Sequence, residues 1–199
     1  RLIVHEAIAD DFLAAVKVLA AKVKVGDPLD DHTKVGAMIS ADHMEKVAGY
    51  VSAAKTDGGN VFSGGARLAS NAGQYLDPTI IRNVTEDMAI AREEVFGPVL
   101  SVLTFESIEK ALHIANNTPY GLSAGVWSAS IDTCMSVARH VRSGTVWVNT
   151  FMEGYPELPF GGYKQSGLGR ELGKRAVEDY TEEKTIQFHR GQRTGWWVG

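Results

Sequence analysis

Residues 99 to 148 alternate between short apolar runs rich in β-branched residues and longer segments with helical spacing. The predicted elements are strand Val99 to Phe105, a helix capped by Ser107 and running to Ala115, strand Ala124 to Trp127, helix Ile131 to Val141 and strand Thr145 to Val148. Strand and helix in alternation are typical of a parallel sheet with helices packed on its faces. The sequence therefore predicts an α/β fold with a parallel-type sheet and flanking helices.

Upstream of this alternation the sequence predicts two further helices. Leu2 to Val4 forms a buried strand, and the helix from about Ala7 to Lys22 is expected to bury one face. That face would carry Ile8, Phe12, Val16 and Leu19. Ser40 caps the second helix, whose buried face would carry Met44, Val47, Val51 and Ala54. A short strand at Val61 and Phe62 follows.

The C-terminal part has a different character. A glycine-rich loop from Phe160 to Gly169 precedes a helix expected from Arg170 to about Tyr180. Lys184 to His189 then alternates as an edge strand would, and the tail ends in Trp196-Trp197-Val198. We therefore expect a compact unit over residues 1–181 and a strand with its tail over residues 182–199.

Composition excludes several partners. The net charge is -4 and the pI is near 5.9, so neither nucleic acid nor an anionic membrane is expected to bind. Cys134 is the single cysteine, which excludes an internal disulfide and fits a reducing compartment, the cytoplasm. The chain opens at Arg1, without a methionine and inside an apolar run, so we expect it to be a fragment of a longer protein.

The segment Glu93-Glu94-Val95-Phe96-Gly97-Pro98 is the most informative motif. Gly97 permits close backbone approach and Pro98 fixes φ, so the turn before the strand at Val99 is stiff. One interpretation is a solvated acidic turn with Phe96 in the core. The other is that the turn holds Glu94 and Phe96 at the mouth of the strand, ready for a ligand.

Four blocks resemble the aldehyde dehydrogenase superfamily, in that family's order and spacing. They are Glu93 to Leu100, Asn116 to Leu122, Gly144 to Asn149 and Pro159 to Glu171. The resemblance covers essentially all of Arg1 to His189, corresponds to the C-terminal portion of the family, and includes features of betaine aldehyde dehydrogenase-like members. It implies oxidation of a small aldehyde to a carboxylic acid with NAD or NADP, which the missing half would mostly bind.

By this resemblance Glu94 would accept hydrogen bonds from the nicotinamide ribose, and Phe96 would pack beside the nicotinamide. Charged acceptors bind hydroxyls more strongly than neutral ones, and an aromatic face orients the ring. Glu93 is expected to be solvated or to act as a local cap.

The nucleophilic cysteine of the family lies a few residues before a segment like Arg1 to Val4, and it is absent. Cys134 lies at helical spacing beside Ile131, Met135 and Ala138, which is typical of a buried small residue. The isolated chain is therefore expected to be inactive. The alternative is a non-catalytic module that assembles with other chains through its edge strand.

Glu171 and the glycine-rich loop carry two further expectations. The structural interpretation of Glu171 is a first-turn carboxylate stabilised by the helix dipole. The resemblance implies a proton relay toward the general base. It also implies a potassium ion held by the main-chain carbonyls of Lys164 and Gly167, since such carbonyls suit a hard cation.

Asn149, Phe151 and Tyr155 would line the family's substrate tunnel. Phe151 and Tyr155 form either an aromatic box for a quaternary ammonium group or plain walls for an apolar aldehyde. Betaine aldehyde dehydrogenases often have tryptophan where Phe151 stands, which weakens the first interpretation. Trp127 and Trp147 are expected in the core. The strand from Lys184 would join a neighbouring subunit, making the parent a homo-dimer or homo-tetramer.

Overall fold

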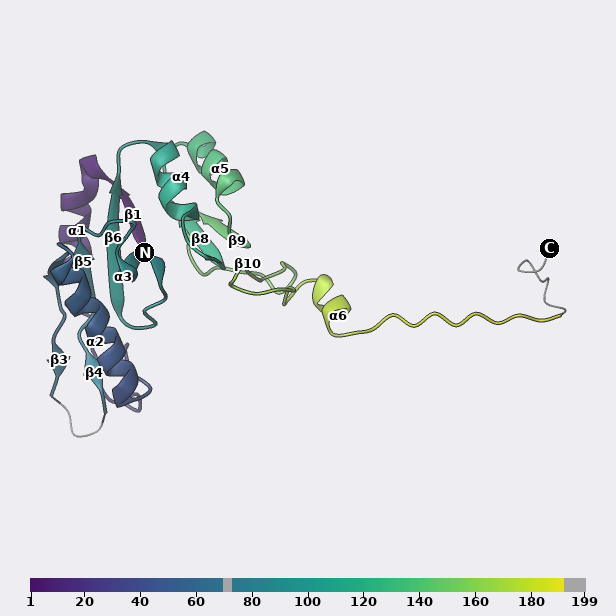
Figure 1. Ribbon diagram of the computed structural model, residues 1–199, viewed down its shortest axis with the longest axis horizontal. Coiled ribbons are helices and arrows are strands. Elements are labelled where there is room, and N and C mark those ends of the chain that lie inside the picture. Colours follow the sequence, from purple (N-terminus) through teal and green to yellow (C-terminus); the bar gives the residue numbers. More distant parts are fainter. Residues whose placement is uncertain (70–72, 192–199) are drawn as a thin grey trace.

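The computed structural model describes residues 1–69 and 73–191. Its elements alternate between strands and helices along most of the chain (Figure 1). They are β1 (Leu2–His5), α1 (Glu6–Ala20), α2 (Ala41–Thr56), β2 (Asn60–Ser63), β3 (Arg67–Leu68), β4 (Tyr75–Leu76), β5 (Thr79–Arg82), α3 (Ala89–Arg92), β6 (Val99–Phe105), α4 (Ile108–Asn116), β7 (Tyr120–Gly121), β8 (Ser123–Val126), α5 (Ile131–His140), β9 (Thr145–Val148), β10 (Tyr163–Lys164) and α6 (Arg175–Asp179).

The main sheet is mixed, with strand order β1-β6-β5-β2. β6 pairs in parallel with both β1 and β5, and Leu2 lies opposite Val102. β2 pairs antiparallel with β5. The predicted α/β fold with flanking helices is confirmed, and the antiparallel edge strand makes the sheet mixed.

The predicted strand-helix alternation divides between two sheets. β6 belongs to the main sheet, whereas β8 and β9 pair in parallel with each other. β7 forms a separate antiparallel pair with β10. α4 contacts β1 and β6 on one side and α5 on the other, so it joins the two parts (Figure 1).

Helices cover both faces of the main sheet. Because side chains alternate along a strand, Ile80 and Ile81 point to opposite faces. Ile81 packs with α2 through Met44, Val47, Val51 and Ala54, which are the four positions predicted for its buried face. Ile80 packs with α1 through Ala9 and Leu13.

The predicted buried face of α1 is wrong. Ala9 and Leu13 are buried and Val16 is partly buried, whereas Ile8 and Leu19 are 55% and 63% exposed. The helix carries two apolar stripes, and only the stripe on Leu13 faces the sheet. Spacing alone does not distinguish two apolar faces of one helix.

The last predicted helix is much shorter than expected. Leu172 and Gly173 both have φ of 60°, so the backbone leaves the helical region before α6 begins at Arg175. Glu171 instead forms an antiparallel bridge with Phe160. Its predicted place in the first turn of a helix is therefore wrong.

Residues 184–189 form no strand in this chain, contrary to the expectation from their alternation. The segment runs away from the rest of the molecule, with Ile186 and Phe188 each 80% exposed (Figure 1). A strand needs a partner strand, and none lies beside this segment among the described residues. Trp196 to Val198 lie outside the described residues.

No helix in residues 1–69 and 73–191 combines the length and the apolar character that crossing a membrane requires.

Candidate functional site

The loop from Glu93 to Pro98 is tied to α2 at two points. The Tyr50 hydroxyl donates to Glu93 Oε2 at 2.5 Å, and this bond raises the pKa of Tyr50. His43 Nε2 lies 2.8 Å from the Phe96 carbonyl oxygen, which can only accept, so Nε2 carries the proton. As expected, Glu93 is exposed and caps α3, its N–H donating to the Ala89 carbonyl, and its carboxylate has in addition a partner from a helix far upstream.

Close packing also fixes the second half of this loop. A Cβ on Gly97 would lie 3.0 Å from Val47 Cγ1, so glycine allows the loop to approach α2. The Thr79 N–H donates to the Pro98 carbonyl at 2.8 Å, which joins the loop to β5. The loop is therefore held on both sides before it enters β6.

Glu94 and Phe96 face outward from this anchored loop. Val95 between them is buried, whereas Phe96 is 76% exposed with φ of 53°. Among the described residues, no hydrogen bond or ion pair engages the Glu94 carboxylate. The core interpretation of Phe96 is wrong, and an unpartnered carboxylate stands two residues from an exposed aromatic ring. This pair could bind hydroxyls and pack against a flat ring.

Asn149 fastens the end of β9 to the loop after β8. Its Oδ1 accepts from the Ser128 N–H and its Nδ2 donates to the Ser128 carbonyl, each at 3.0 Å. The Asn149 N–H donates to the Val126 carbonyl at 2.9 Å. These bonds, together with its φ of 55°, set the direction in which the following loop leaves the sheet.

An aromatic cluster of Trp127, Trp147 and Phe151 lies beside this loop. Phe151 packs edge-on against Trp147 with centroids 5.1 Å apart, and Trp127 lies 6.4 Å away. Trp127 is 60% exposed, so its predicted place in the core is wrong. No signal in the sequence placed Trp127 in the site; in the structure Gly125 leaves room for its indole, since a Cβ there would lie 2.6 Å from the ring. Tyr155 is 68% exposed, and no ring pair among the described residues joins it to this cluster.

The glycine-rich loop lies on the turn between α4 and β7. The Gln165 N–H donates to the Pro119 carbonyl, and the Gly121 N–H donates to Ser166 Oγ, each at 2.9 Å. Lys164 Nζ donates to the carbonyls of Asn116 at 3.1 Å and Thr118 at 3.0 Å. Partial burial, with Arg142 and Arg1 nearby, lowers the pKa of Lys164. The sequence blocks Asn116 to Leu122 and Pro159 to Glu171 are thus joined into one structural unit.

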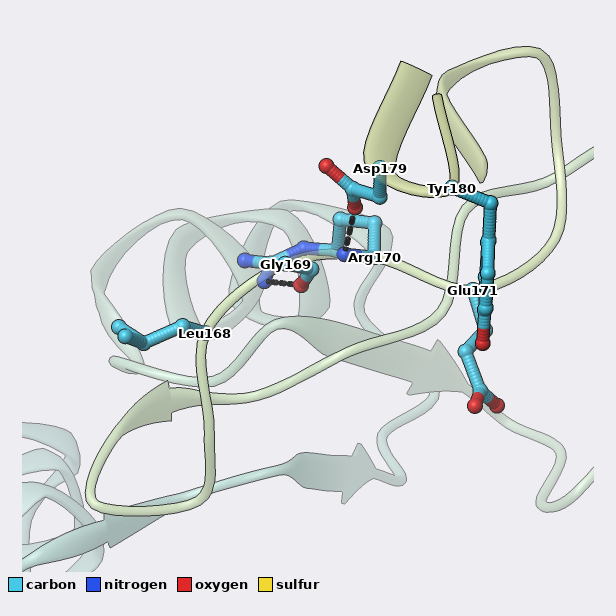
Figure 2. Close-up of a pocket in the computed structure, with 6 residues that line it drawn as sticks. All are labelled: Leu168, Gly169, Arg170, Glu171, Asp179 and Tyr180. Carbon is cyan, nitrogen blue, oxygen red and sulfur yellow. Dashed lines mark hydrogen bonds between the residues drawn. The ribbon is translucent and has the colours of Figure 1, made fainter. Parts of the chain in front are cut away.

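Arg170 organises the end of this loop. Its guanidinium donates to the carbonyls of Gly162 at 3.0 Å and Gly169 at 2.5 Å. The backbone N–H of Arg170 donates to Asp179 Oδ2 at 2.5 Å. An open surface hollow lies between Leu168, Gly169, Arg170, Glu171, Asp179 and Tyr180 (Figure 2). The Glu171 carboxylate points away from Arg170 (Figure 2).

Glu171 is fixed by its backbone alone. It exchanges two main-chain hydrogen bonds with Phe160, of 2.7 and 2.8 Å, and no side-chain bond engages its carboxylate among the described residues. No hydrogen bond, ion pair or ring contact in residues 1–69 and 73–191 joins Glu94, Phe151 and Glu171. The predicted site residues therefore form three separate groups in this chain.

Cys134 is fully buried in α5, as predicted. Its thiol lies 3.7 Å from the Ser128 carbonyl, the same residue that Asn149 fastens. The thiol is a packing group beneath the loop and is not open to an attacking position.

Comparison with known proteins shows the family of this chain. The model of the aldehyde dehydrogenase family matches residues 1–186. The chain belongs to the aldehyde dehydrogenase family. It is 46% identical over 189 residues to a betaine aldehyde dehydrogenase of Bacillus subtilis, covering 94% of this chain and 39% of that protein.

Solved structures agree with this membership. An NAD-dependent aldehyde dehydrogenase from Sinorhizobium meliloti superposes with a TM-score of 0.91 at 46% identity, over 100% of this chain and 39% of that one. A betaine aldehyde dehydrogenase from Staphylococcus aureus, solved with NAD+, gives 0.90 at 38% identity, over 99% and 41%. The chain thus spans about two fifths of the length of these proteins.

Proposed function

We propose that this chain is part of an enzyme that oxidises an aldehyde to a carboxylic acid with NAD or NADP, through a cysteine thiohemiacetal. The observation that carries the proposal is the anchored loop with its two outward side chains, Glu94 and Phe96. The similar proteins from Sinorhizobium meliloti and Staphylococcus aureus are described as NAD-dependent and as NAD+-bound, respectively. The nucleophilic cysteine and most of the dinucleotide site are proposed to lie outside these 199 residues.

In this proposal Glu94 accepts hydrogen bonds from the nicotinamide ribose hydroxyls and Phe96 packs beside the nicotinamide ring. The fit is supported by the free Glu94 carboxylate and by the exposed ring of Phe96, both on a loop that Tyr50, His43 and Thr79 hold in place. When bound, the nicotinamide supplies the hydride acceptor. The chain's own task is to orient the ring without a large rearrangement of the loop.

Glu94→Gln in the full-length enzyme tests this role. A charge-assisted hydrogen bond contributes about 1.5–3 kcal/mol, so we expect weaker cofactor binding or slower hydride transfer by about tenfold or more. The matched control is Glu106→Gln, an exposed carboxylate just after β6. Isothermal calorimetry with NAD and single-turnover kinetics read the effect. Unchanged cofactor affinity together with unchanged turnover in Glu94→Gln would exclude the role.

We further propose that Phe151 and Tyr155 line the passage for the aldehyde, with Asn149 fixing where that passage begins. The exposed aromatic cluster next to Asn149 supports this proposal. Two substrates separate the aromatic box from plain apolar walls: betaine aldehyde, which carries a quaternary ammonium group, and its neutral isostere 3,3-dimethylbutanal. A cation–π contribution would favour the charged aldehyde in kcat/KM, and Phe151→Leu would reduce that preference.

Glu171 is proposed as a partner in a proton relay. Its support is an exposed carboxylate with no side-chain bond among the described residues, on backbone that Phe160 fixes on both sides. A relay predicts that Glu171→Gln alters the pH profile of kcat, whereas a structural role predicts an unchanged profile.

A potassium ion at the carbonyls of Lys164 and Gly167 is a further proposal. Both residues have positive φ, 54° and 131°, in a loop rich in glycine, where carbonyls can turn toward a cation. Thermal unfolding in KCl and NaCl of equal ionic strength is the test, and equal unfolding midpoints would exclude the potassium site.

The compartment proposed is the cytoplasm, in keeping with the single reduced cysteine.

A further inference from the structure

The C-terminal end of α4 is closed by two cationic side chains. The last four carbonyls of a helix lack partners within the helix, and they form the negative end of its dipole. The Arg1 guanidinium donates to the carbonyls of Ile114 and Ala115, both at 3.0 Å. Lys164 Nζ donates to the carbonyls of Asn116 and Thr118 at 3.1 and 3.0 Å. Carbonyls at the end of the helix and in the turn after it thus receive charged donors.

These two cations come from distant parts of the sequence. Arg1 precedes β1, the strand at the edge of the main sheet, and Lys164 lies on β10, within the glycine-rich loop. Asn116 also ties this end of α4 to α5, because its Oδ1 accepts from the Arg142 N–H at 2.7 Å and its Nδ2 donates to the His140 carbonyl at 3.0 Å. The end of α4 is therefore where β1, α5 and the glycine-rich loop meet.

The hydrogen-bond partners of Lys164 differ from those of an ordinary surface lysine. Its ammonium bonds two neutral carbonyls of a turn and has no carboxylate partner among the described residues. Charge-assisted bonds of this kind are stronger than neutral ones, and their donor can be replaced only by another cation with N–H groups. The neighbouring bonds from Gln165 and Gly121 lie on the same turn, so they depend on the same approach of the two segments.

We propose that the Lys164 side chain is a positioning residue: its ammonium acts as a tethered cation that locks the glycine-rich loop onto the turn after α4. The loop then leads through the Phe160 and Glu171 bridge to the carboxylate of Glu171. This inference rests on the proposed function for the importance of Glu171. It assigns the side chain of Lys164 a role that is separate from any use of its main-chain carbonyl.

Hydrogen exchange of the full 199-residue chain measures the lock directly. Lys164→Met keeps the aliphatic stem and removes the charge. We expect the Gln165 and Gly121 amides to exchange about tenfold faster, whereas the Leu103 amide in β6 stays unchanged. Lys164→Arg, which keeps a charged donor, should retain most of the protection. Lys184→Met on the exposed C-terminal segment is the control. Unchanged exchange at Gln165 and Gly121 in Lys164→Met would overturn the proposal.

Chemical rescue tests the charge itself. In Lys164→Ala, added ethylammonium should restore protection at these two amides, because it supplies both a charge and N–H donors. Tetramethylammonium has the charge without donors and should fail. Equal effects of the two salts, or no effect of either, would show that the ammonium does not hold the turn. Neither measurement needs turnover, so a failure here is distinguishable from a failure of the proposed dehydrogenase activity.

Discussion

Glu86 shows how one side chain holds the start and the end of α4 to the preceding segment. Its carboxylate accepts from Lys110 Nζ, and Oε2 accepts from Asn117 Nδ2 at 3.0 Å and lies 3.2 Å from His113 Nε2. The hydrogen bond from Lys110 is the main cause that lowers the pKa of Glu86, and burial opposes it. The side chain is 19% exposed, so solvent screens the pairing only in part.

The lowered pKa of Glu86 predicts a pH dependence with a definite sign. A carboxyl whose pKa is lower in the folded state contributes stability above its unfolded value, and this stability is lost as the pH falls through the folded value. Glu86→Gln should therefore lower the unfolding free energy at pH 7 by about 0.5–1 kcal/mol. The difference from the wild type should shrink below pH 4.5, the ordinary value for a glutamate. Urea titrations at several pH values check this, and a difference independent of pH would contradict it.

Residue roles were predictable only where the sequence neighbours decide them. The burial of Cys134 followed from helical spacing. The surroundings of Glu93 did not, because Tyr50 lies in another helix, 43 positions upstream. Trp127 was expected in the core because tryptophan usually is, but it lies just past the end of β8, where strand alternation no longer applies.

At the scale of elements, α1 carries the least expected result. Sequence analysis predicts a buried face at Ile8, Phe12, Val16 and Leu19, whereas the structure places the sheet against the stripe of Ala9 and Leu13. Leu13 is 3% exposed and Leu19 is 63% exposed, so one helix offers the same residue type in both environments. The pair makes a matched test of which stripe stabilises this chain.

Leu13→Ala is expected to lower the unfolding free energy by about 2–4 kcal/mol, because it removes buried methyl groups and leaves a cavity. Leu19→Ala should change it by less than about 0.5 kcal/mol, since the side chain is solvated and alanine is a good helix former. Both are read from chemical denaturation with a common m-value. A larger loss for Leu19 than for Leu13 would show that the buried face has been assigned wrongly.

Elements were predictable where local signals agree. β6, α4, α5 and β9 have serine caps or long apolar runs and were found within a residue or two. β5 was not predicted, because its four residues follow Pro78 and are too few to show a period. The helix expected from Arg170 does not form, because the backbone has a positive φ at Leu172, which the composition of the segment does not reveal.

At the scale of the molecule, α4 joins the main sheet to the part that contains β8 and β9, and a C-terminal segment runs outward (Figure 1). The three groups of candidate site residues lie on separate parts of this frame. In the proposed enzyme they would converge only with the remainder of the fold around them. The separation was not visible in the sequence, because motif order says nothing about which sheet each motif enters.

The isolated chain is expected to produce no NADH from any aldehyde, because its single thiol is buried in α5. Absorbance at the NADH band after incubation with NAD and an aldehyde panel is the measurement. Cys134→Ser serves as the control for trace activity from host enzymes. NADH formation by the purified chain that disappears in Cys134→Ser would contradict both the expectation and the structural role of that cysteine.

We propose that the segment from Lys184 to His189 adds a strand to a neighbouring subunit, so the parent enzyme is a dimer or tetramer. Its alternation and the exposure of Ile186 and Phe188 support this, since a segment with strand alternation and exposed apolar side chains can pair with the open edge of another sheet. Replacing Ile186 and Phe188 by lysine in the parent should lower the mass measured by light scattering. The matched control replaces Thr185 and Gln187, on the opposite face. Full mass after deletion from Lys184 onward would disprove the role.

The pairing of β1 with β6 sets the order in which the main sheet can assemble during synthesis. Leu2 lies beside Val102, so β1 leaves the ribosome about a hundred residues before its neighbour exists. At roughly 5–20 residues per second, this apolar strand waits on the order of 5–20 s for β6. The edge that pairs with β6 is unfilled by that strand throughout the interval, and an unpaired edge is a template for other chains. Chaperone dependence of this chain should therefore be greatest before Phe105 has emerged, and should fall sharply once β6 can close over β1.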